Sequence, residues 1–569
     1  MTFDLVVRGG RVVDGIGTPA YTADVAVLDG QVRKIGRVDD RALDEVDADG
    51  CIVAPGFIDI HTHYDAQLHW DRTASPSSWH GVTTVVTGNC GFSLFPARAD
   101  DVPWLLDMLS RVEGMSAAAL RAGVSFEGGG FDEFATGLEG RLGVNAAVQV
   151  GHSALRRYVL GDDAHRRVAT EAEVDEMATL LRAALRAGAA GFSSSQLEMH
   201  VDHDGNPVPS NLASPEELVA LAAVLAEFDH GVIEFISATN LAGHSEADRE
   251  LMRAMCRASG KAMNINPLQR LPFLGDGWRL GLDFATECMR AGLRIHPQSS
   301  LQQLSVFFAL HDTFLFDEMP AWRDALARPP AEKRALLTDP ATRERLRAAL
   351  ADPTGRAFVF TWDAVKVARA DEHSEWVGRT VESLAKQLGV DALDCFIDCS
   401  LAEELQTTFV LAGSAGKRSR EATEEILRHP MSLPGSSDAG AHLTSYCGVD
   451  YSTRLLTEYA PEVITLEEAV AGLTSRPAAA LGLGAERGRI TSGAGADLTI
   501  WDPARLRAGA TRWIQDFPAG AGRFVVDAEG YVANVVNGEV VRRDGADTGA
   551  RPGEILRPAA PTHRDVFEG

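Results

Sequence analysis

Short apolar runs alternate with amphipathic segments through the middle of the chain. Thr170 and Glu173 form a capping box before apolar residues at helical spacing, and Ser214 followed by Pro215 is typical of a helix start. The apolar runs predict strands that end near His63, Cys90, His152, Ser195, Ser237, Leu268, Ser299 and Asp438. Eight strands joined mostly by helices predict an α/β fold of the (β/α)8 TIM-barrel type. A doubly wound open sheet is the alternative, but no G-x-G-x-x-G follows the first strand to favour it.

The two ends of the chain carry a different pattern, of short strands and tight turns. Apolar runs on either side of Gly9-Gly10 predict a hairpin, and Asp29-Gly30 marks a second turn. Near the C-terminus, residues 496–503 predict a strand and residues 531–545 a hairpin around Asn537-Gly538. Each set is too small to bury a core alone, so we expect one small β-sandwich domain built from both termini. Two separate ribbons on the edge of the main domain are the alternative.

These patterns divide the chain into three parts. We expect residues 1–54 and 485–569 to supply the two parts of the β-sandwich, the latter with a tail, and residues 55–484 to form the barrel. A polar-rich helical stretch at about 312–430 interrupts the barrel pattern as an insertion. Its charge run is typical of a solvated helix face, with a lid or an oligomer contact as the alternative.

Composition narrows the class of protein. The 569 residues are 45% hydrophobic and 24% charged, as in ordinary globular enzymes, so disorder is excluded for most of the chain. The net charge of −26 argues against binding to nucleic acid or to an anionic membrane. The first residues lack the pattern of a secretory signal, and no apolar run is long enough to span a bilayer. We therefore expect a soluble cytoplasmic protein whose seven scattered cysteines are reduced thiols.

The sharpest chemical signal is the segment GFIDIHTHYD, residues 56–65. Side chains alternate across a strand, so His61 and His63 point to the same side, at the end of the first barrel strand. The C-terminal ends of the strands form the catalytic face of such a barrel. Imidazole nitrogens are common ligands of zinc and similar metals, so the pair predicts a metal site. A structural histidine pair is the alternative.

Two other strand ends carry groups of the same chemistry. Cys90 lies between Gly88 and Gly91 after the second strand, where a thiolate could bind a metal ion; a buried cysteine acting as a small hydrophobe is the alternative. Asp438, in GSSDAGAHL, follows the predicted eighth strand and could bind a metal ion and accept a proton from water, or cap a turn. His442 nearby is a candidate substrate contact, with a helix-cap role as the alternative.

Further polar residues lie on or beside the predicted strands. His152 and His296 are candidates for contact with substrate or with the metal ligands, and a structural role is the alternative for His152. Glu234 is a charge inside an apolar strand, where burial without a partner would be costly. A metal ligand, a substrate contact and an internal ion pair are all open for it. His200 and His203 lie in a turn-rich segment that predicts a surface loop over the barrel mouth.

Taken together, these segments resemble the amidohydrolase superfamily, and within it the D-aminoacylase (N-acyl-D-amino-acid deacylase) branch. The resemblance covers nearly the whole chain and rests on LVVRGGRVVDG, APGFIDIHTHYDAQ, HGVTTVVTGNCGFS, VGHSALR, GSSDAGAHL, RGRITSGAGADLTIWDP and VVNGEVV. It implies a metal-dependent (β/α)8 barrel beside a small β-sandwich built from both chain ends. It also implies that His61, His63 and Cys90 lie at the metal site and that Asp438 acts as general base toward the attacking water.

The chain departs from the branch on two strands. The D-aminoacylase pattern has two more metal-binding histidines, at the ends of the fifth and sixth strands. Residues 231–240 and 261–270 contain no histidine, and Glu234 or Ile236 and Asn266 stand near those positions. The fourth strand also lacks a lysine that could be carbamylated, as in other branches.

One divalent ion therefore fits this sequence better than two, with Zn²⁺ as the expected metal. Its predicted ligands are His61, His63 and Asp438, with Cys90 as a further ligand. Asn266 and Glu234 join the candidates for contact with substrate or ligands.

The predicted function is metal-dependent hydrolysis of an amide bond that is not a peptide bond in a protein. The resemblance suggests an N-acyl-D-amino acid as the substrate. Hydrolysis of a cyclic amide, imide, lactam or carbamate by the same residues is the first alternative. A catalytically inactive barrel that acts as an assembly protein is the second. The expected partner is a small-molecule substrate, with no nucleic acid and no membrane, and the large insertion favours a homo-oligomer.

Overall fold

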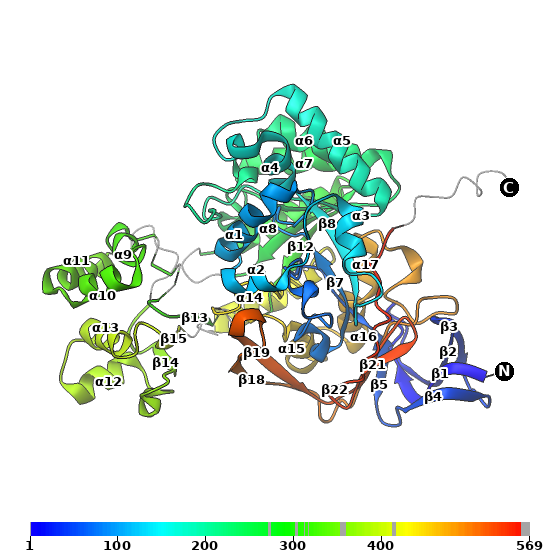
Figure 1. Ribbon diagram of the computed structural model, residues 1–569. Coiled ribbons are helices and arrows are strands. Elements are labelled where there is room, and N and C mark those ends of the chain that lie inside the picture. Colours follow the sequence, from blue (N-terminus) through cyan, green and yellow to red (C-terminus); the bar gives the residue numbers. More distant parts are fainter. Residues whose placement is uncertain are drawn as a thin grey trace.

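A curled sheet of eight parallel strands lies at the centre of the molecule (Figure 1). The computed structural model describes residues 2–270, 275–301, 305–311, 313, 315–316, 318–352, 360–411, 417–445 and 447–558. The strands of the sheet are β6 (Phe57–Asp59), β7 (Val82–Thr87), β8 (Asn145–Gly151), β9 (Gly191–Ser195), β10 (Val232–Ile236), β11 (Ala262–Leu268), β12 (Ile295–Ser299) and β16 (Leu433–Pro434). They pair in the order β16-β12-β11-β10-β9-β8-β7-β6. The two edges approach each other beyond the strands, where Thr62 and Ala439 form a parallel bridge.

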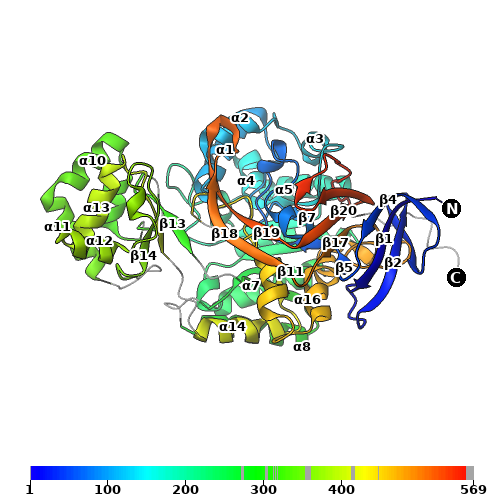
Figure 2. The ribbon, with the colours of Figure 1, turned by 90° about the horizontal axis from the view of Figure 1, so that it is seen from below.

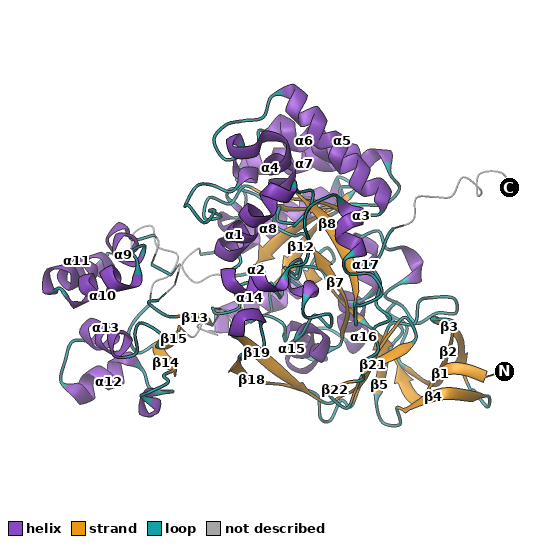
Figure 3. Ribbon diagram, viewed as in Figure 1, coloured by secondary structure: helices purple, strands orange, loops and turns teal. Residues whose placement is uncertain are grey.

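Helices surround this sheet, as the alternating pattern predicts (Figure 3). Those of the central region are α1 (Val102–Val112), α2 (Ala117–Gly123), α3 (Phe131–Thr136), α4 (His152–Leu160), α5 (Glu171–Ala187), α6 (Pro215–Val224), α7 (Glu246–Ser259), α8 (Gly277–Arg290), α14 (Lys417–Arg428), α15 (Tyr451–Arg454), α16 (Leu466–Leu473) and α17 (Ser475–Ala480). The capping box of Thr170 and Glu173 opens α5, and Ser214 caps α6, which confirms both predicted helix starts. The strands are almost wholly buried, which explains their apolar runs.

Strands from both ends of the chain share one nine-stranded sheet (Figure 2). Its members are β1 (Thr2–Val12), β2 (Tyr21–Leu28), β3 (Gln31–Gly36), β4 (Arg41–Asp47), β5 (Ile52–Pro55), β17 (Leu498–Trp501), β20 (Tyr531–Val536), β21 (Glu539–Arg543) and β22 (Ala546–Asp547). The junction between the two ends is the antiparallel pairing of β5 with β17. Two further strands, β18 (Arg507–Ile514) and β19 (Arg523–Glu529), form a separate ribbon. The β-sandwich itself stays a prediction.

One predicted hairpin is wrong. The chain around Gly9-Gly10 does not turn back, because β1 runs from Thr2 to Val12 and pairs with β2 on both sides of the glycines. The register shifts between Val7 and Gly10, and Gly9 has a φ of 67°, so the pair forms a bulge within one strand. The turns at Asp29-Gly30 and Asn537-Gly538 do form hairpins, which join β2 to β3 and β20 to β21.

The predicted insertion contains a hydrophobic core of its own and projects from the central sheet (Figures 1 and 2). It comprises α9 (Pro320–Leu326), α10 (Pro330–Thr338), α11 (Pro340–Ala351), α12 (Val381–Leu388) and α13 (Ala392–Ala402) with a three-stranded sheet of β13 (Val306–Phe308), β15 (Thr408–Leu411) and β14 (Val365–Arg369). The sequence predicted helices alone here, at about 312–430. The observed unit begins earlier, at β13, and α14 of the predicted stretch packs on the central region instead, against Leu268 and Leu282. Residues 312, 314, 317, 353–359 and 412–416 of that stretch lie outside the described residues. Phe307 joins the insertion to β19 by stacking on Phe524 at 4.0 Å between ring centroids.

No helix in the described part of the chain is long and apolar enough to cross a membrane.

Candidate metal and catalytic site

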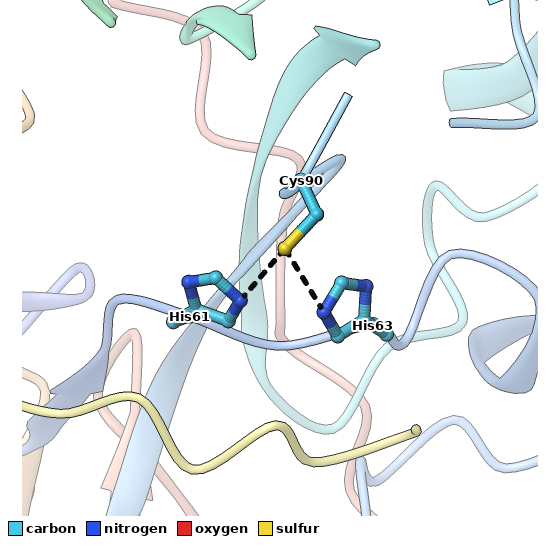
Figure 4. Close-up of side chains that lie close together, drawn as sticks. All are labelled: His61, His63 and Cys90. Atoms are coloured by element: carbon cyan, nitrogen blue, oxygen red, sulfur yellow. Dashed lines mark hydrogen bonds between the residues drawn. The ribbon is translucent and has the colours of Figure 1, made fainter. Parts of the chain in front are cut away.

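Three potential ligands converge beyond the ends of β6 and β7 (Figure 4). Cys90 Sγ lies 3.4 Å from His61 Nε2 and 3.8 Å from His63 Nε2. All three ligand atoms lie within 4.8 Å of one another, and all three residues are buried. Both histidines lie just past β6, on either side of the bridge residue Thr62, and the Nε2 atoms of both rings face Cys90 Sγ.

The backbone around Cys90 is folded to bring its sulfur to the histidines. Cys90 has a φ of 56°, a left-handed conformation that is uncommon for residues other than glycine. Gly88 and Gly91 on either side also have positive φ values, of 76° and 78°. Asn89 holds the turn in place, because its side-chain amide donates to Thr62 O over 3.0 Å. Strained residues of this kind occur where a site requires a particular side-chain direction.

Asp438 faces the two histidines from the other edge of the sheet. Its Oδ1 lies 3.2 Å from His61 Nε2 and 3.8 Å from His63 Nε2. The side chain of Asp438 is 30% exposed, whereas those of His61 and His63 are 0% and 5% exposed. Asp438 is therefore the member of this group that substrate and water reach most easily. It has a φ of 50°, and Ser437 beside it donates to the buried Asp59 Oδ2 over 2.7 Å.

Polar partners fix the orientation of both histidine rings. His61 Nδ1 lies 2.9 Å from Gln298 Oε1 on β12, and since that oxygen only accepts, Nδ1 carries the proton. His63 Nδ1 lies 3.0 Å from Glu113 Oε1, at the C-terminal end of α1. In both rings the Nε2 atom is the one that faces Cys90 and Asp438. The tautomer that leaves a lone pair on Nε2 is the one that binds a metal ion.

The charges of this group stabilise one another. Burial alone would lower the pKa of His63, but the carboxylate of Glu113 outweighs burial and raises the pKa to about 9. Burial alone would raise the pKa of Asp438, but the hydrogen bond and charge of His61, together with His63, lower it to about 2. The carboxylate is thus ionised near neutral pH and available as a ligand or proton acceptor.

Glu234 and Asn266 also reach this group, as their positions on β10 and β11 predict. Glu234 Oε2 accepts from Cys90 N over 2.6 Å, and Asn266 Nδ2 lies 3.5 Å from His61 Nε2 and 3.9 Å from Cys90 Sγ. Glu234 Oε1 and Asn266 Oδ1 are buried without a hydrogen-bond partner among the described residues. Burial raises the pKa of Glu234 to about 7. Burial also raises the pKa of the Cys90 thiol, and the nearby carboxylates of Glu234, Glu113 and Asp438 add to the effect.

Of the three remaining candidate residues, one lies at the site and two lie elsewhere. His442 lies beside the group, because its backbone N donates to the carbonyl oxygen of Glu113. His152 lies in another buried cluster, where its Nδ1 is 2.8 Å from Ser194 Oγ and its Nε2 is 2.8 Å from Glu217 Oε1. His296 lies at the start of β12 rather than at its end, and its Nδ1 is 3.1 Å from Met431 O. The structure therefore brings His442 to the site but neither His152 nor His296.

Sequence reasoning missed two residues of the site, Glu113 and Gln298, and it placed a third, His200, only in a surface loop over the barrel mouth. Glu113 and Gln298 orient His63 and His61, and His200 lies near enough for the charges of Glu113 and Asp438 to act on its ring. Burial is the larger effect and lowers the pKa of His200 to about 4. His200 does belong to a loop outside the strands, but Ser195 Oγ holds its Nδ1 at 2.9 Å and turns it inward. The charge of Glu113 just after an apolar helix was the one signal available in the sequence.

Comparisons with known proteins agree with this site. The pattern of the amidohydrolase family matches residues 44–542. The N-acyl-D-aspartate deacylase of Alcaligenes xylosoxydans xylosoxydans is 29% identical over 564 residues, which cover 98% of this chain and 95% of the relative. A solved D-aminoacylase whose binuclear metal centre shows one-metal activation and second-metal attenuation is 25% identical, with a TM-score of 0.64 over 98% of this chain and 100% of that one. The N-acyl-D-glutamate deacylase of Bordetella bronchiseptica, solved with zinc and a phosphonate that mimics the tetrahedral intermediate, is 26% identical, with the same TM-score and coverage.

The chain belongs to the amidohydrolase family. It is a metal-dependent hydrolase that acts on carbon–nitrogen bonds other than peptide bonds, which confirms the predicted class of reaction.

Proposed function

We propose that this protein cleaves the amide bond of an N-acyl-D-amino acid, with one divalent ion bound by His61, His63 and Asp438 and with Cys90 as a further ligand. The observation that carries the proposal is the convergence of two Nε2 atoms and one Sγ atom within 4.8 Å, beside the Asp438 carboxylate. Imidazole, thiolate and carboxylate are the groups that bind zinc in proteins, so the donor set fits such an ion. When bound, the ion would polarise the scissile carbonyl and lower the pKa of the attacking water.

The residues of the chain would supply the remaining steps. Asp438 is ionised and partly exposed, so it can accept a proton as water oxygen bonds to the carbonyl carbon. It then returns that proton to the leaving nitrogen as the carbon–nitrogen bond breaks. Gln298, through a hydrogen bond to His61, and Glu113, through an ion pair with His63, keep the two rings in place throughout, because neither group reacts.

One ion, with zinc as the metal, suits this chain better than two. Glu234 or Ile236, and Asn266, stand near the positions where the D-aminoacylase pattern has histidines, and Glu234 already accepts a hydrogen bond from the backbone of Cys90. A solved relative contains zinc, which supports that choice of metal. The D-amino acid specificity rests on the relatives, whose names give N-acyl-D-aspartate and N-acyl-D-glutamate as substrates.

Several other expectations from the sequence analysis also remain predictions. They are the closed (β/α)8 barrel, the β-sandwich and the domain boundaries at residues 54 and 485. The cytoplasmic location, the absence of nucleic-acid partners and the homo-oligomer belong with them.

The first test measures metal per chain by elemental analysis, and then hydrolysis of a panel of N-acetyl-D-amino acids, N-acetyl-L-amino acids, cyclic imides and carbamates. We expect about one zinc ion per chain and hydrolysis of the D-amino acid derivatives alone. His61→Ala should lose the metal, while His203→Ala, which removes a partly exposed histidine outside the group, should keep it. Asp438→Asn should lower kcat by about 10²- to 10⁴-fold, the usual contribution of a general base.

Other results would contradict particular parts of the proposal. Two ions per chain would contradict the single-ion site, and a preference for cyclic imides or carbamates would contradict the substrate class. A wild-type chain that takes up no metal under any loading condition would contradict the mechanism as a whole.

A further inference from the structure

Glu113 occupies a position that helix stability does not explain. It is the residue that ends α1, and its carboxylate lies where the partial negative charge of the helix C-terminus disfavours an anion. Its side chain is also only 4% exposed, and burial of a carboxylate is costly unless a partner compensates it. Both effects destabilise the fold locally, which indicates that the Glu113 carboxylate has a role through the contact that it makes.

That contact is with a proposed metal ligand. Glu113 Oε1 lies 3.0 Å from His63 Nδ1, on the side of the ring opposite to the Nε2 atom that faces Cys90 and Asp438. A carboxylate at this place holds the proton on Nδ1, fixes the plane of the ring and makes Nε2 a better electron donor.

The main chain of the same residue makes a second contact with the site. The carbonyl oxygen of Glu113 accepts a hydrogen bond from His442 N, in the loop that carries Asp438. The two backbones pack closely, since a Cβ on Gly114 would lie 3.5 Å from His442 Cα. Glu113 therefore connects the chain beyond β6 with the chain beyond β16, the two edges of the curled sheet.

We propose that Glu113 is a positioning residue that orients His63 for the metal ion and fixes the Asp438 loop relative to it. This inference rests on the proposed function of the site. A positioning role for Glu113 also gives a function to α1, the helix between β7 and β8 whose C-terminal end lies beside His63.

The test compares metal affinity among matched variants. Metal-free wild type, Glu113→Gln, Glu113→Met and Asp107→Asn are titrated with Zn²⁺ in competition with a chromophoric chelator. Asp107 is the control because it is a carboxylate on the same helix that pairs with Arg121 instead. Glu113→Met keeps the length of the side chain and removes the acceptor, so we expect zinc binding weakened by about 10- to 100-fold. Glu113→Gln keeps a neutral acceptor, so its affinity for zinc should lie between those of the wild type and Glu113→Met. The affinity of Asp107→Asn should match that of the wild type.

A second readout separates positioning from general loss of structure. With Co²⁺ in place of Zn²⁺, the visible absorption bands report the ligand geometry, and we expect them to shift in Glu113→Met but not in Asp107→Asn. If Glu113→Met does not fold, Glu113→Gln decides, and zinc binding at least several-fold weaker than wild type supports the proposal.

Equal zinc affinity and unchanged Co²⁺ bands in the folded Glu113 variants would overturn the proposal, while wild type still binds zinc. Failure of wild type itself to bind zinc is a different result, and it contradicts the proposed function instead.

Discussion

His244, a histidine outside the metal group, is buried in a form that favours the neutral ring. His244, just after β10, is 6% exposed, and its Nδ1 lies 2.9 Å from Ser237 Oγ. Burial lowers the pKa of His244 to about 4; Asp248 opposes this effect and Arg249 adds to it. In the unfolded chain the ring titrates near its ordinary value of about 6.5. The neutral His244 ring therefore does not reduce the free energy of unfolding above about pH 6.5. As the pH falls from 6.5 toward 4, the free energy of unfolding decreases, because only the unfolded state binds the proton.

The prediction is that His244→Asn flattens the acid side of the stability profile. Asparagine tolerates the left-handed backbone at this position, where φ is 65°, and it does not titrate. Between pH 6.5 and 4, wild type should lose up to about 1.4 kcal/mol of stability per pH unit more than the variant. The melting temperature of both proteins across this range measures the difference, and parallel curves would show that His244 does not contribute.

The ligands themselves could be predicted from the sequence, but their supports could not. His61, His63, Cys90 and Asp438 each stand within a few residues of an apolar strand end, and a barrel gathers its strand ends at one face. Glu113 reaches His63 only because α1 folds back over that face, and no local pattern encodes such a contact. His296 shows the converse error: the sequence makes it a candidate contact, but it lies at the start of a strand that ends, as predicted, at Ser299, and its ring bonds to Met431 O instead.

At the scale of elements, the loop after β16 has an unusual backbone. Every second residue from Ser436 to His442 has a positive φ: 61° at Ser436, 50° at Asp438, 91° at Gly440 and 51° at His442. The alternation bends the chain tightly around the metal group and directs Asp438 toward the histidines. The sequence GSSDAGAH allowed a turn here as the alternative to a metal-binding role, but a turn signal does not reveal that three residues with side chains adopt left-handed conformations.

Gly440 should be the least replaceable residue of this loop. A Cβ at this position would lie 2.6 Å from the backbone carbonyl carbon of His63, in addition to the left-handed strain. We expect Gly440→Ala to displace His63 and to weaken zinc binding by at least about 10-fold, the cost usual when a ligand loses its orientation.

The matched control is Gly140→Ala, where φ is 68° and a Cβ would meet nothing within 4 Å. That variant carries only the backbone penalty of about 1–2 kcal/mol and should bind zinc as wild type does. Equal zinc affinity in the two variants would contradict the role of the close approach.

At the scale of the whole molecule, the insertion and the central sheet bury separate hydrophobic cores. Trp322 lies at the centre of the insertion core, stacked on Phe316 at 4.3 Å between ring centroids and fully buried. Leu221 on α6 is equally buried in the main core. The sequence predicted an insertion at about 312–430 from its polarity. It did not predict the separate core between Val306 and Leu411, because the aromatic residues of that core are dispersed along the chain and meet only in the fold.

Two cores predict two unfolding transitions in calorimetry. Trp322→Ala should destabilise the insertion by about 3–5 kcal/mol and lower one transition, while zinc binding persists. Leu221→Ala leaves a cavity in the main core and should lower the temperature of the other transition. A single transition that both variants shift equally would show instead that the insertion and the region of the central sheet unfold as one unit.

The pairing of β5 with β17 has a consequence for how the protein is made. A ribosome releases β5 long before β17, which begins at Leu498, after every strand of the central sheet. Until then, β5 has a free edge of the kind that pairs with other strands. Only Gly56 separates β5 from β6, the strand that leads to His61, so β5 gains its second partner only after the central sheet has been synthesised. Shortened chains that end before Leu498 would keep that edge open, and they are the ones expected to aggregate or to occupy chaperones.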